Sequence, residues 1–448
     1  MDLRSILRTA LREHDGDETE YISRIETELE GDISPFSPGS SSLSLVRFDC
    51  MLQDVGYPME VYSEGSDDWS DLKERWVGWA VEIPGSSRSS STNTLPESLH
   101  SKFPLENHGD YLGALLKVYD EGPSREPAAL VRVVGVVSSA PMPALEDVMV
   151  PCIHVLRSGP VPKPLSSPCS RQELLDYFTA SFSPPDSLAA EYLLLSLISS
   201  PSARPTGLPP LGTLSLNFIG GSLKPLLNQL TRTVTLSLSL PNLHSSSFQP
   251  HSPDSTSLNS GRLQLPSGTV VLVDEDAMGQ GGKLETKAVK NLQALSDCMK
   301  SQMLGYEYPY MDNLKMKCEL RFIVTSQGKS MLPLDVHLPV GSMTQPSTPP
   351  PQGSDALLAQ LGSSEHAAKL EIPEDVAKEI QESFVTSRKA GGNANDAEAT
   401  LTRRMRIARL IALSNDDAKL SESVWARAVE MDTQARERMS GRRDVPAE

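Results

Sequence analysis

The chain has 448 residues, enough for two or three domains, because a single hydrophobic core stops growing at roughly 250 to 300 residues. Its formal net charge of −17 argues against a free-standing nucleic-acid-binding protein, since neutralising phosphates requires a surplus of Lys and Arg on one face. The five cysteines are widely separated and form no CxxC pair, which argues against a disulfide framework and a cysteine zinc site and favours a reducing compartment.

The N-terminal sequence and the apolar runs bear on targeting. MDLRSILRTALREHDGDETE is amphipathic and soon acidic, and it lacks the apolar core and cleavage site of a signal peptide. The longest apolar run, LAAEYLLLSLI, is about half of the ~20 residues that span a bilayer. We therefore expect a soluble, intracellular protein that does not associate with membranes.

The first part of the chain is predicted to be a helical segment followed by a β domain. Leu3, Ile6 and Leu7 recur at intervals of three and four, which predicts a helix within residues 1–33. Residues 45–156 contain β-rich runs broken by Gly, Pro and Ser and by a Ser-rich insertion: LVRFDCMLQDV, MEVYSEG, WVGWAVEIPG, YLGALLKVYD and ALVRVVGVVSSA. This pattern predicts a small antiparallel OB-like barrel with a disordered insertion.

The pattern changes after residues 157–170, a proline-rich segment that we predict to be a linker. Within residues 171–340, two helices come first, and the second is capped by Asp186 and apolar on all sides. Continuous apolar strands then alternate with helices, as in NFIG, TVTLSLSL, TVVLVDE and CELRFIVTS. We expect an open α/β sheet that is covered on both faces.

The C-terminal part is predicted to be helical. A second proline-rich linker covers residues 341–354, a small helical bundle covers residues 355–440, and a tail covers residues 441–448. The last long helix is capped by Ser421. The predicted fold class is therefore α+β with several domains.

The run TVVLVDEDAM carries the strongest indication of chemistry. Asp274 and Glu275 end an apolar strand, where AAA+ nucleotide hydrolases carry an Asp that orients magnesium and a Glu that polarises water. The phosphate-binding sequence G-x-x-x-x-G-K-[ST] is missing, however. NFIGGSLKP provides Gly220 and Gly221 for a turn, but Lys224 comes too late and is followed by a proline. We predict a degenerate acidic pair, no ATP hydrolysis and no cofactor.

Other candidate sites are weaker. Thr325 and Ser326 occupy the place of a sensor for the γ-phosphate, although such a run is more often a turn. Trp69, Trp76 and Trp79 could stack on bases, but their acidic neighbours favour core packing or a protein contact. The eight histidines show no HExxH spacing, which argues against a metal site.

Five segments in this order and spacing resemble the minichromosome maintenance (MCM) complex-binding protein family: SLAAEYLLLSLIS, LGTLSLNFIGG, SGRLQLPSGTVVLVDEDAM, NLQALSDCMKSQMLGYEYPY and FIVTSQGKSMLP. LVRFDCMLQDVGYPMEVY and LVRVVGVVS also resemble this family. The resemblance covers most of the chain from about residue 45 and leaves the low-complexity loops unmatched.

The resemblance implies a nuclear, non-catalytic relative of the MCM helicase subunits. It implies an OB-like N-terminal part, a degenerate AAA+ core without a P-loop, and a C-terminal helical lid. The implied function is to bind MCM subunits and to promote their assembly and their removal from chromatin during DNA replication. This would support the cell cycle, mitosis, cell division and sister-chromatid cohesion. A lid helix that begins near Arg403 and Arg404 would face a neighbouring nucleotide site, which makes both arginines candidate partner contacts.

Two other functions stay open from the residues alone. One is a nucleotide-binding AAA+ ATPase, against which the missing Gly-Lys-Ser/Thr argues. The other is an OB-fold protein that binds single-stranded DNA, against which the acidic charge argues. For Arg403 and Arg404, a solvated basic helix face is the alternative to a partner contact.

Overall fold

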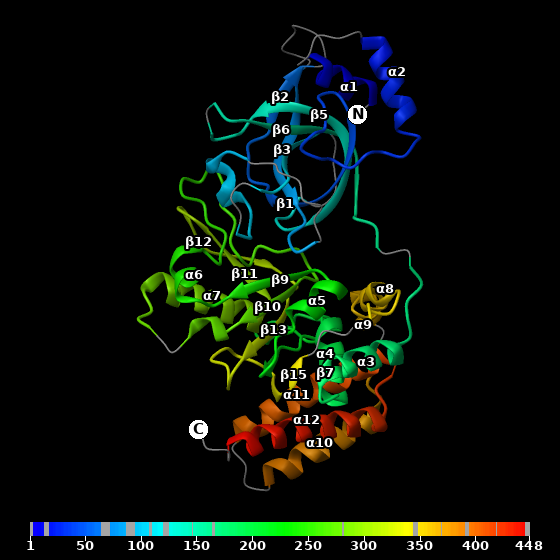
Figure 1. Ribbon diagram of the computed structural model, residues 1–448, viewed down its shortest axis with the longest axis vertical. Helices are drawn as coiled ribbons and strands as arrows, with labels where there is room; N and C mark the ends of the chain where they lie inside the picture. The colour runs from blue at the N-terminus through cyan, green and yellow to red at the C-terminus, as the bar shows by residue number, and fades with distance from the viewer. Residues whose placement is uncertain are drawn as a thin grey trace. The chain divides into compact units, whose positions relative to one another are not determined.

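A computed structural model describes most of the chain (Figure 1). The described residues are 3–12, 18–63, 72–86, 95–106, 110–119, 125–145, 147–163, 166–279, 282–343, 348–368, 370–389, 394–417 and 419–443. The chain divides into two compact units. The β unit comprises Met1–Pro162, Ser246–Ser267 and Leu304–Met316, and the α/β unit comprises Lys163–Ser245, Gly268–Met303 and Lys317–Glu448.

The β unit begins with two helices, α1 (Leu3–Arg12) and α2 (Glu18–Glu28). Its main sheet consists of β1 (Leu45–Asp54), β2 (Glu60–Ser63), β3 (Leu72–Glu82), β4 (Gly113–Val118), β5 (Leu130–Pro141) and β6 (Met149–Gly159), with a 3-10 helix at Glu97–Lys102. The pairings run from β1 to β5, β6, β4 and β3 and return from β3 to β1, and only the β4–β6 pair is parallel. Five strands therefore form a closed ring, because β1 bonds to a strand on each side.

Alternating apolar residues fill the two faces of this sheet. Trp76 and Trp79 are 6% and 0% exposed, and they belong to two different apolar clusters. Gly78 is required between them, because a Cβ there would lie 2.2 Å from the Trp76 ring. Core packing is confirmed for these two tryptophans, whereas Trp69 lies outside the described residues.

The division into units differs from the boundaries expected from the sequence. Residues 246–267 and 304–316 lie within the predicted α/β region 171–340, but they belong to the β unit. A buried ion pair joins Lys102 Nζ to Asp54 Oδ2 at 2.9 Å, and both groups also bond to the backbone of Leu258. Burial lowers the pKa of Lys102, and the attraction of Asp54 opposes this effect. The first of these segments is thus held by polar groups that are far away in the sequence.

The two-stranded sheet β11 (Met303–Tyr308) and β12 (Met311–Lys317) forms most of the second returning segment. Tyr310 at its turn is 91% exposed. Gly305 lies against Gln249, where a Cβ would meet the Gln249 amide at 2.3 Å. The hairpin therefore packs on the other returning segment.

The α/β unit is built on a parallel sheet in the order β14-β8-β13-β10-β9. These strands are β8 (Leu216–Ile219), β9 (Thr233–Ser237), β10 (Val270–Asp274), β13 (Arg321–Ser326) and β14 (Val336–Pro339). Helices α3 (Arg171–Ala180), α4 (Ser187–Ile198), α5 (Lys224–Leu230), α6 (Leu240–Ser245) and α7 (Thr286–Ser301) accompany them, with a small pair of strands, β7 (Phe182–Ser183) and β15 (Ser342–Met343).

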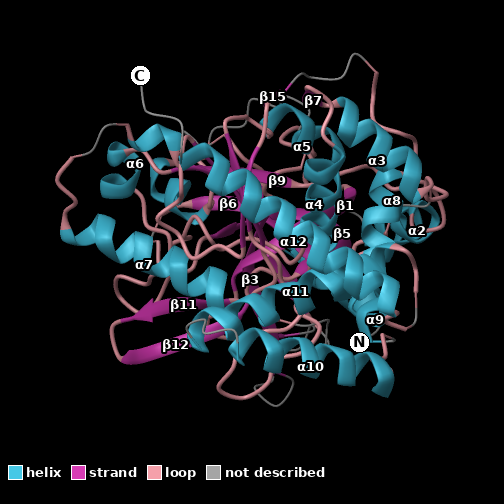
Figure 2. Cartoon of the chain, turned by 90° about the horizontal axis from the view of Figure 1, so that it is seen from below, coloured by secondary structure: helices cyan, strands magenta, loops and turns pink. Residues whose placement is uncertain are grey.

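The C-terminal helices are α8 (Ser354–Leu361), α9 (Ser364–Ala368), α10 (Glu374–Lys389), α11 (Ala394–Ser414) and α12 (Glu422–Arg443). Helices α10, α11 and α12 run alongside one another (Figure 2), and α12 packs against β14. One apolar core joins these helices to α4 and the sheet. The C-terminal helices are therefore part of the α/β unit. Within the described residues, no helix is long and apolar enough to cross a membrane.

Several local predictions for this unit are confirmed. Asp186 accepts a hydrogen bond from Ala189 N at 3.0 Å at the start of α4, whose apolar residues are all buried. Val270 to Val273 are at most 2% exposed, as expected for a covered strand. The Ser421 hydroxyl accepts from Val424 N at 3.4 Å at the start of α12.

Candidate functional site

A pocket of about 310 Å³ lies at the carboxyl ends of β8, β10 and β13, and we call it the edge pocket. In open α/β sheets, ligands bind at this edge. Its lining comprises Gly220, Gly221, Ser222, Lys224, Thr235, Leu272, Asp274, Asp276, Thr325 and Gln327. This is the place that the sequence indicated for a degenerate nucleotide site.

The turn after β8 offers little to a phosphate. Gly220 has φ +102° and its N–H donates to the Ser326 carbonyl at 3.1 Å, so this amide is already used. Lys224 is the basic residue of the lining, and it stands exposed at the start of the seven-residue helix α5. Asp274 and Asp276 line the same pocket, which leaves the lining more acidic than basic.

The two acidic residues at the end of β10 have different surroundings. Asp274 lines the edge pocket, whereas Glu275 does not. The Glu275 carboxylate accepts a hydrogen bond from Met331 N at 3.0 Å through Oε1, and its buried Oε2 has no hydrogen-bond partner among the described residues. Glu275 therefore anchors the loop between β13 and β14 and does not line the edge pocket.

The sensor-like residues also differ from each other. Thr325 is the next-to-last residue of β13 and lines the edge pocket, so it is part of a strand and not of a turn. Ser326 Oγ lies 2.9 Å from Asn217 Oδ1. Asn217 Nδ2 donates to the Gly328 carbonyl at 3.1 Å and lies 3.2 Å from His337 Nδ1. His337 Nδ1 is thus the acceptor, which places the ring proton on Nε2.

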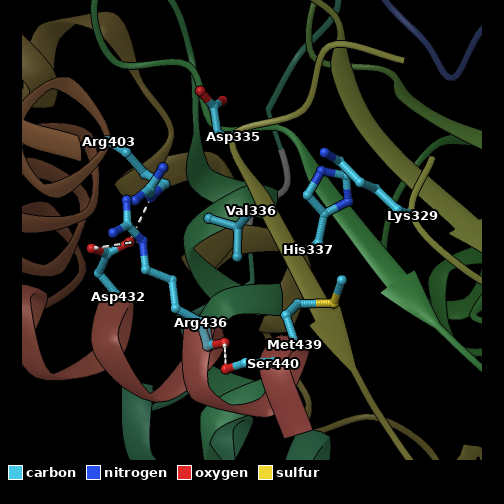
Figure 3. A pocket seen from close by; sticks show the side chains of 10 residues that line it. Lys329, Asp335, Val336, His337, Arg403, Asp432, Arg436, Met439 and Ser440 are labelled. Carbon is cyan, nitrogen blue, oxygen red and sulfur yellow. Dashed lines mark hydrogen bonds and ion pairs between the residues drawn. The ribbon is translucent and has the colours of Figure 1, made fainter. Parts of the chain in front are cut away.

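A second pocket of about 310 Å³ lies between β14, α11 and α12, and we call it the basic pocket (Figure 3). Its lining comprises Lys329, Asp335, Val336, His337, Arg403, Asp432, Ala435, Arg436, Met439 and Ser440. In Figure 3, Arg403 and Arg436 lie on one side of Val336, and His337 and Lys329 lie on the other. It shares no lining residue with the edge pocket.

Asp432 organises one wall of the basic pocket. Its side chain is 2% exposed, and it accepts from Arg403 Nε at 2.5 Å and from Arg404 Nε at 2.9 Å. Arg436 Nε lies 3.7 Å away. Burial raises the pKa of the Asp432 carboxyl, but the hydrogen bond and charge of Arg403, together with Arg404 and Arg436, outweigh this and lower the pKa below its ordinary value.

Asp335 holds the opposite end of the pocket. Its Oδ2 accepts from the backbone N and the hydroxyl of Ser215, at 2.9 and 3.0 Å, and its Oδ1 pairs with Arg406 of α11. The loop before β14 is thereby fastened both to the sheet and to the helices. Both carboxylates of the lining are therefore occupied by partners within the chain.

The structure brings Arg403 and Arg404 together, but not at the edge pocket. Their side chains are 17% and 22% exposed, and both are bound to Asp432. Helix α11 begins at Ala394, so the prediction of a helix start near the two arginines is wrong. The preceding Ala-rich and Glu-containing residues favour a longer helix.

Sequence reasoning missed Asp432, Lys329, His337 and Arg436. Only the i, i+4 spacing of Asp432 and Arg436 is a local indication, and such spacing is common on solvated helices. Within the part of the chain that the structure describes, no group of three His, Cys, Asp or Glu side chains could hold a metal ion.

The family model of the mini-chromosome maintenance replisome factor matches residues 81–439. The chain belongs to this family. The matched range includes every residue that lines the edge pocket. The family resemblance predicted from the sequence is thus confirmed.

Curated members of the family share a printed name, mini-chromosome maintenance complex-binding protein. The chain is 33% identical to the Salmo salar protein over 291 residues, which cover 60% of this chain and 45% of that protein. It is 28% identical to the Danio rerio protein over 438 residues, 83% and 68% of the two chains. For the Arabidopsis thaliana protein, identity is 25% over 433 residues, 84% and 70%. The match with the salmon relative thus spans about half of that relative's length.

Proposed function

We propose that this chain binds MCM helicase subunits and does not hydrolyse ATP. The printed names of its relatives support the binding partner. The contact between Glu275 Oε1 and Met331 N supports the proposal that the chain does not hydrolyse ATP, because it holds the candidate catalytic carboxylate outside the edge pocket. The Gly220 N–H, which already donates to the Ser326 carbonyl, supports the same conclusion. Phosphoryl transfer depends on several positioned groups at once, and this amide is not available to a phosphate.

The proposed architecture is a degenerate AAA+ core with an OB-like barrel and a helical lid. In support, β13 separates the glycine-turn strand β8 from the acidic strand β10 in a parallel sheet, as in AAA+ proteins. The closed five-strand ring of the β unit supports the OB-like assignment. Helices α8 to α12, which follow the sheet, would be the lid.

Such a relative could act on a ring of similar subunits. Ring interfaces repeat the same pair of surfaces, so a related fold that lacks one catalytic edge can occupy a place without completing the ring. We propose that this opens or competes with MCM contacts, and so promotes MCM assembly and removal from chromatin in the nucleus. Support for cell division and sister-chromatid cohesion would follow from that activity.

The partner is tested by capture of purified MCM subunits, singly and as mixtures, on the immobilised full-length chain. We expect stable capture of at least one subunit, with an unrelated acidic protein of similar charge as the control. Failure to capture any subunit or mixture would contradict the proposal. The full chain is needed because the β unit takes residues from three separate segments, so cutting near residue 162 would remove two of them.

Catalysis is tested on the same preparation by measuring phosphate release from ATP. We expect none above the protein-free blank. Turnover by the wild type that Glu275→Gln abolishes would show that Glu275 acts as a catalytic base and would refute the non-catalytic assignment. A filter-binding measurement with labelled ATP separates this result from nucleotide binding without hydrolysis.

Arg403 and Arg404 stay candidates for partner contact through the part of each side chain that is exposed. Charge reversal is a poor test, because it would remove the partners of the buried Asp432. Arg404→Lys keeps the charge and loses the guanidinium geometry, so it should weaken capture only if Arg404 also bonds to the partner.

A further inference from the structure

The basic pocket concentrates positive charge in a chain of net charge −17. Its acidic lining residues, Asp335 and Asp432, are already paired with arginines of α11. Lys329 and Arg436 add further charge to the lining, and both are exposed. The pocket therefore has an excess of cations over carboxylates.

The cations of this pocket repel one another. Burial lowers the pKa of Arg436, and the charges of Arg403 and Arg404 lower it further, against the attraction of Asp432. Burial also lowers the pKa of His337, and Lys329 and Arg403 add to this. A bound anion would relieve this repulsion, since opposite charge favours the charged form of each group.

Residues with hydrogen-bond donors line the cavity on two sides. His337 has its proton on Nε2, because Nδ1 faces the Asn217 amide. Lys329 stands exposed beside it, and Figure 3 shows both across Val336 from Arg403 and Arg436. The Arg436 side chain is 52% exposed, and its Nη2 donates to Thr400 Oγ1, so a ligand bound to its other donors would leave the Arg403–Asp432 pair intact.

The number of donors favours a phosphate over a carboxylate. A phosphate monoester has three terminal oxygens and close to two negative charges, so it can accept from more of these groups at once. The remaining lining consists of the apolar side chains of Val336, Ala435 and Met439 together with Ser440, and none of the described residues that line the pocket is a Phe, Tyr or Trp on which a nucleobase could stack. The lining therefore suits a phosphate on a short aliphatic carrier.

We propose that the basic pocket binds the phosphate of a phosphoserine or phosphothreonine side chain presented by a protein partner. Lys329 and Arg436 supply exposed cations, while His337 Nε2–H and Arg403 supply donors fixed by Asn217 and Asp432. Arg and Lys side chains are the usual partners of phosphorylated residues. This site is separate from the edge pocket and does not require that the partner is an MCM subunit.

The test uses the full-length chain and synthetic Gly-phosphoserine-Gly, with Gly-Ser-Gly, inorganic phosphate and ATP as comparisons. Binding is followed by NMR of the histidine ring signals, with His337→Gln used to assign the His337 signal. We expect the phosphopeptide to shift the His337 signal in a saturable manner. Lys329→Glu should weaken this binding about tenfold or more, because it replaces an attractive charge with a repulsive one.

The matched control is Lys300→Glu, which makes the same charge change at an exposed position of α7 outside the pocket lining. It should leave phosphopeptide binding unchanged, and its unfolding curve should match that of Lys329→Glu.

No response of His337, or an equal loss in both Lys→Glu variants, would overturn the site. An equal response to Gly-Ser-Gly, or tighter binding of ATP or inorganic phosphate, would overturn the phosphoserine assignment. Since the probe is a synthetic peptide, these results do not depend on whether the chain captures MCM subunits.

Discussion

The edge pocket and the basic pocket have the same volume, about 310 Å³, and belong to the same compact unit, yet their charges differ. The edge pocket lies where the sequence predicted a degenerate nucleotide site, and its lining has Asp274 and Asp276 against Lys224. The basic pocket has its carboxylates neutralised by arginines and keeps cations to spare. The sequence pattern typical of a nucleotide site and the excess of positive charge thus lie in different pockets of this unit.

The physical reason lies in what each acidic residue contacts. Glu275 anchors the loop between β13 and β14 through Met331 N, and Asp274 lines the edge pocket next to a turn that lacks the Gly-Lys-Ser/Thr sequence. Asp432, by contrast, holds guanidinium groups in fixed positions.

Val271→Asp should have the largest effect. Val271 is 1% exposed in the central part of β10, so the substitution places an unpaired charge in a covered sheet and should cost about 3 to 5 kcal/mol of unfolding free energy. Urea unfolding followed by circular dichroism measures this. Val289→Asp at a half-exposed position of α7 is the matched control. Equal midpoints for the two variants would show that β10 is not structural.

Asp432→Asn should cost about 2 to 3 kcal/mol, because the variant keeps the shape but leaves Arg403 and Arg404 without their counter-charge. Asp274→Asn, the same change in the edge pocket, should stay within about 0.5 kcal/mol. Paired unfolding measurements at pH 7 compare the two. A reversal of this order would mean that the acidic strand end, and not the Asp432 cluster, holds the unit together.

The contribution of Asp432 should depend on pH. Its pKa is lowered in the folded chain, so its stabilisation is fully present above the unfolded pKa of about 3.9 and is lost as the pH falls through the folded value. The difference in unfolding free energy between wild type and Asp432→Asn should therefore be constant from pH 7 to 5 and shrink below about pH 4. A difference that grows on acidification would have the wrong sign.

Glu275→Gln should have the smallest effect. The amide oxygen can still accept from Met331 N, so the stability should change by less than about 0.5 kcal/mol, and capture of MCM subunits should not change. Glu275→Ala, which removes the acceptor, should cost about 1 kcal/mol. Thermal unfolding and subunit capture measure both, and a loss of capture in Glu275→Gln with unchanged stability would point to a functional carboxylate.

Local patterns predicted the elements of the α/β unit well. The apolar helix after Asp186, the buried strand from Val270 and the Ser421 cap are each encoded within a few neighbouring residues. The two pockets differ in this respect. The edge pocket follows from strand ends that the sequence marks, whereas the basic pocket depends on contacts between β14, α11 and α12.

Contacts across long separations were not predictable from one sequence. Arg403 and Asp432 are 29 residues apart, and nothing in the sequence around either residue indicates that the two form a pair. Lys102 and Leu258 are 156 residues apart, which explains why the boundaries of the β unit were missed. Hydrophobic periodicity predicts which face of a helix or strand is buried, but it does not predict which other element that face packs against.

The returning segments of the β unit also determine when that unit can mature during synthesis. Its ring of strands is translated by Gly159, but Leu258 and the hairpin that ends at Lys317 emerge much later. Until then, Lys102 and Asp54 lack the backbone groups of Leu258 that complete their burial. A ribosome paused before residue 258 would therefore carry a ring of strands whose Lys102–Asp54 pair is incompletely buried, and this nascent form should depend most on chaperones.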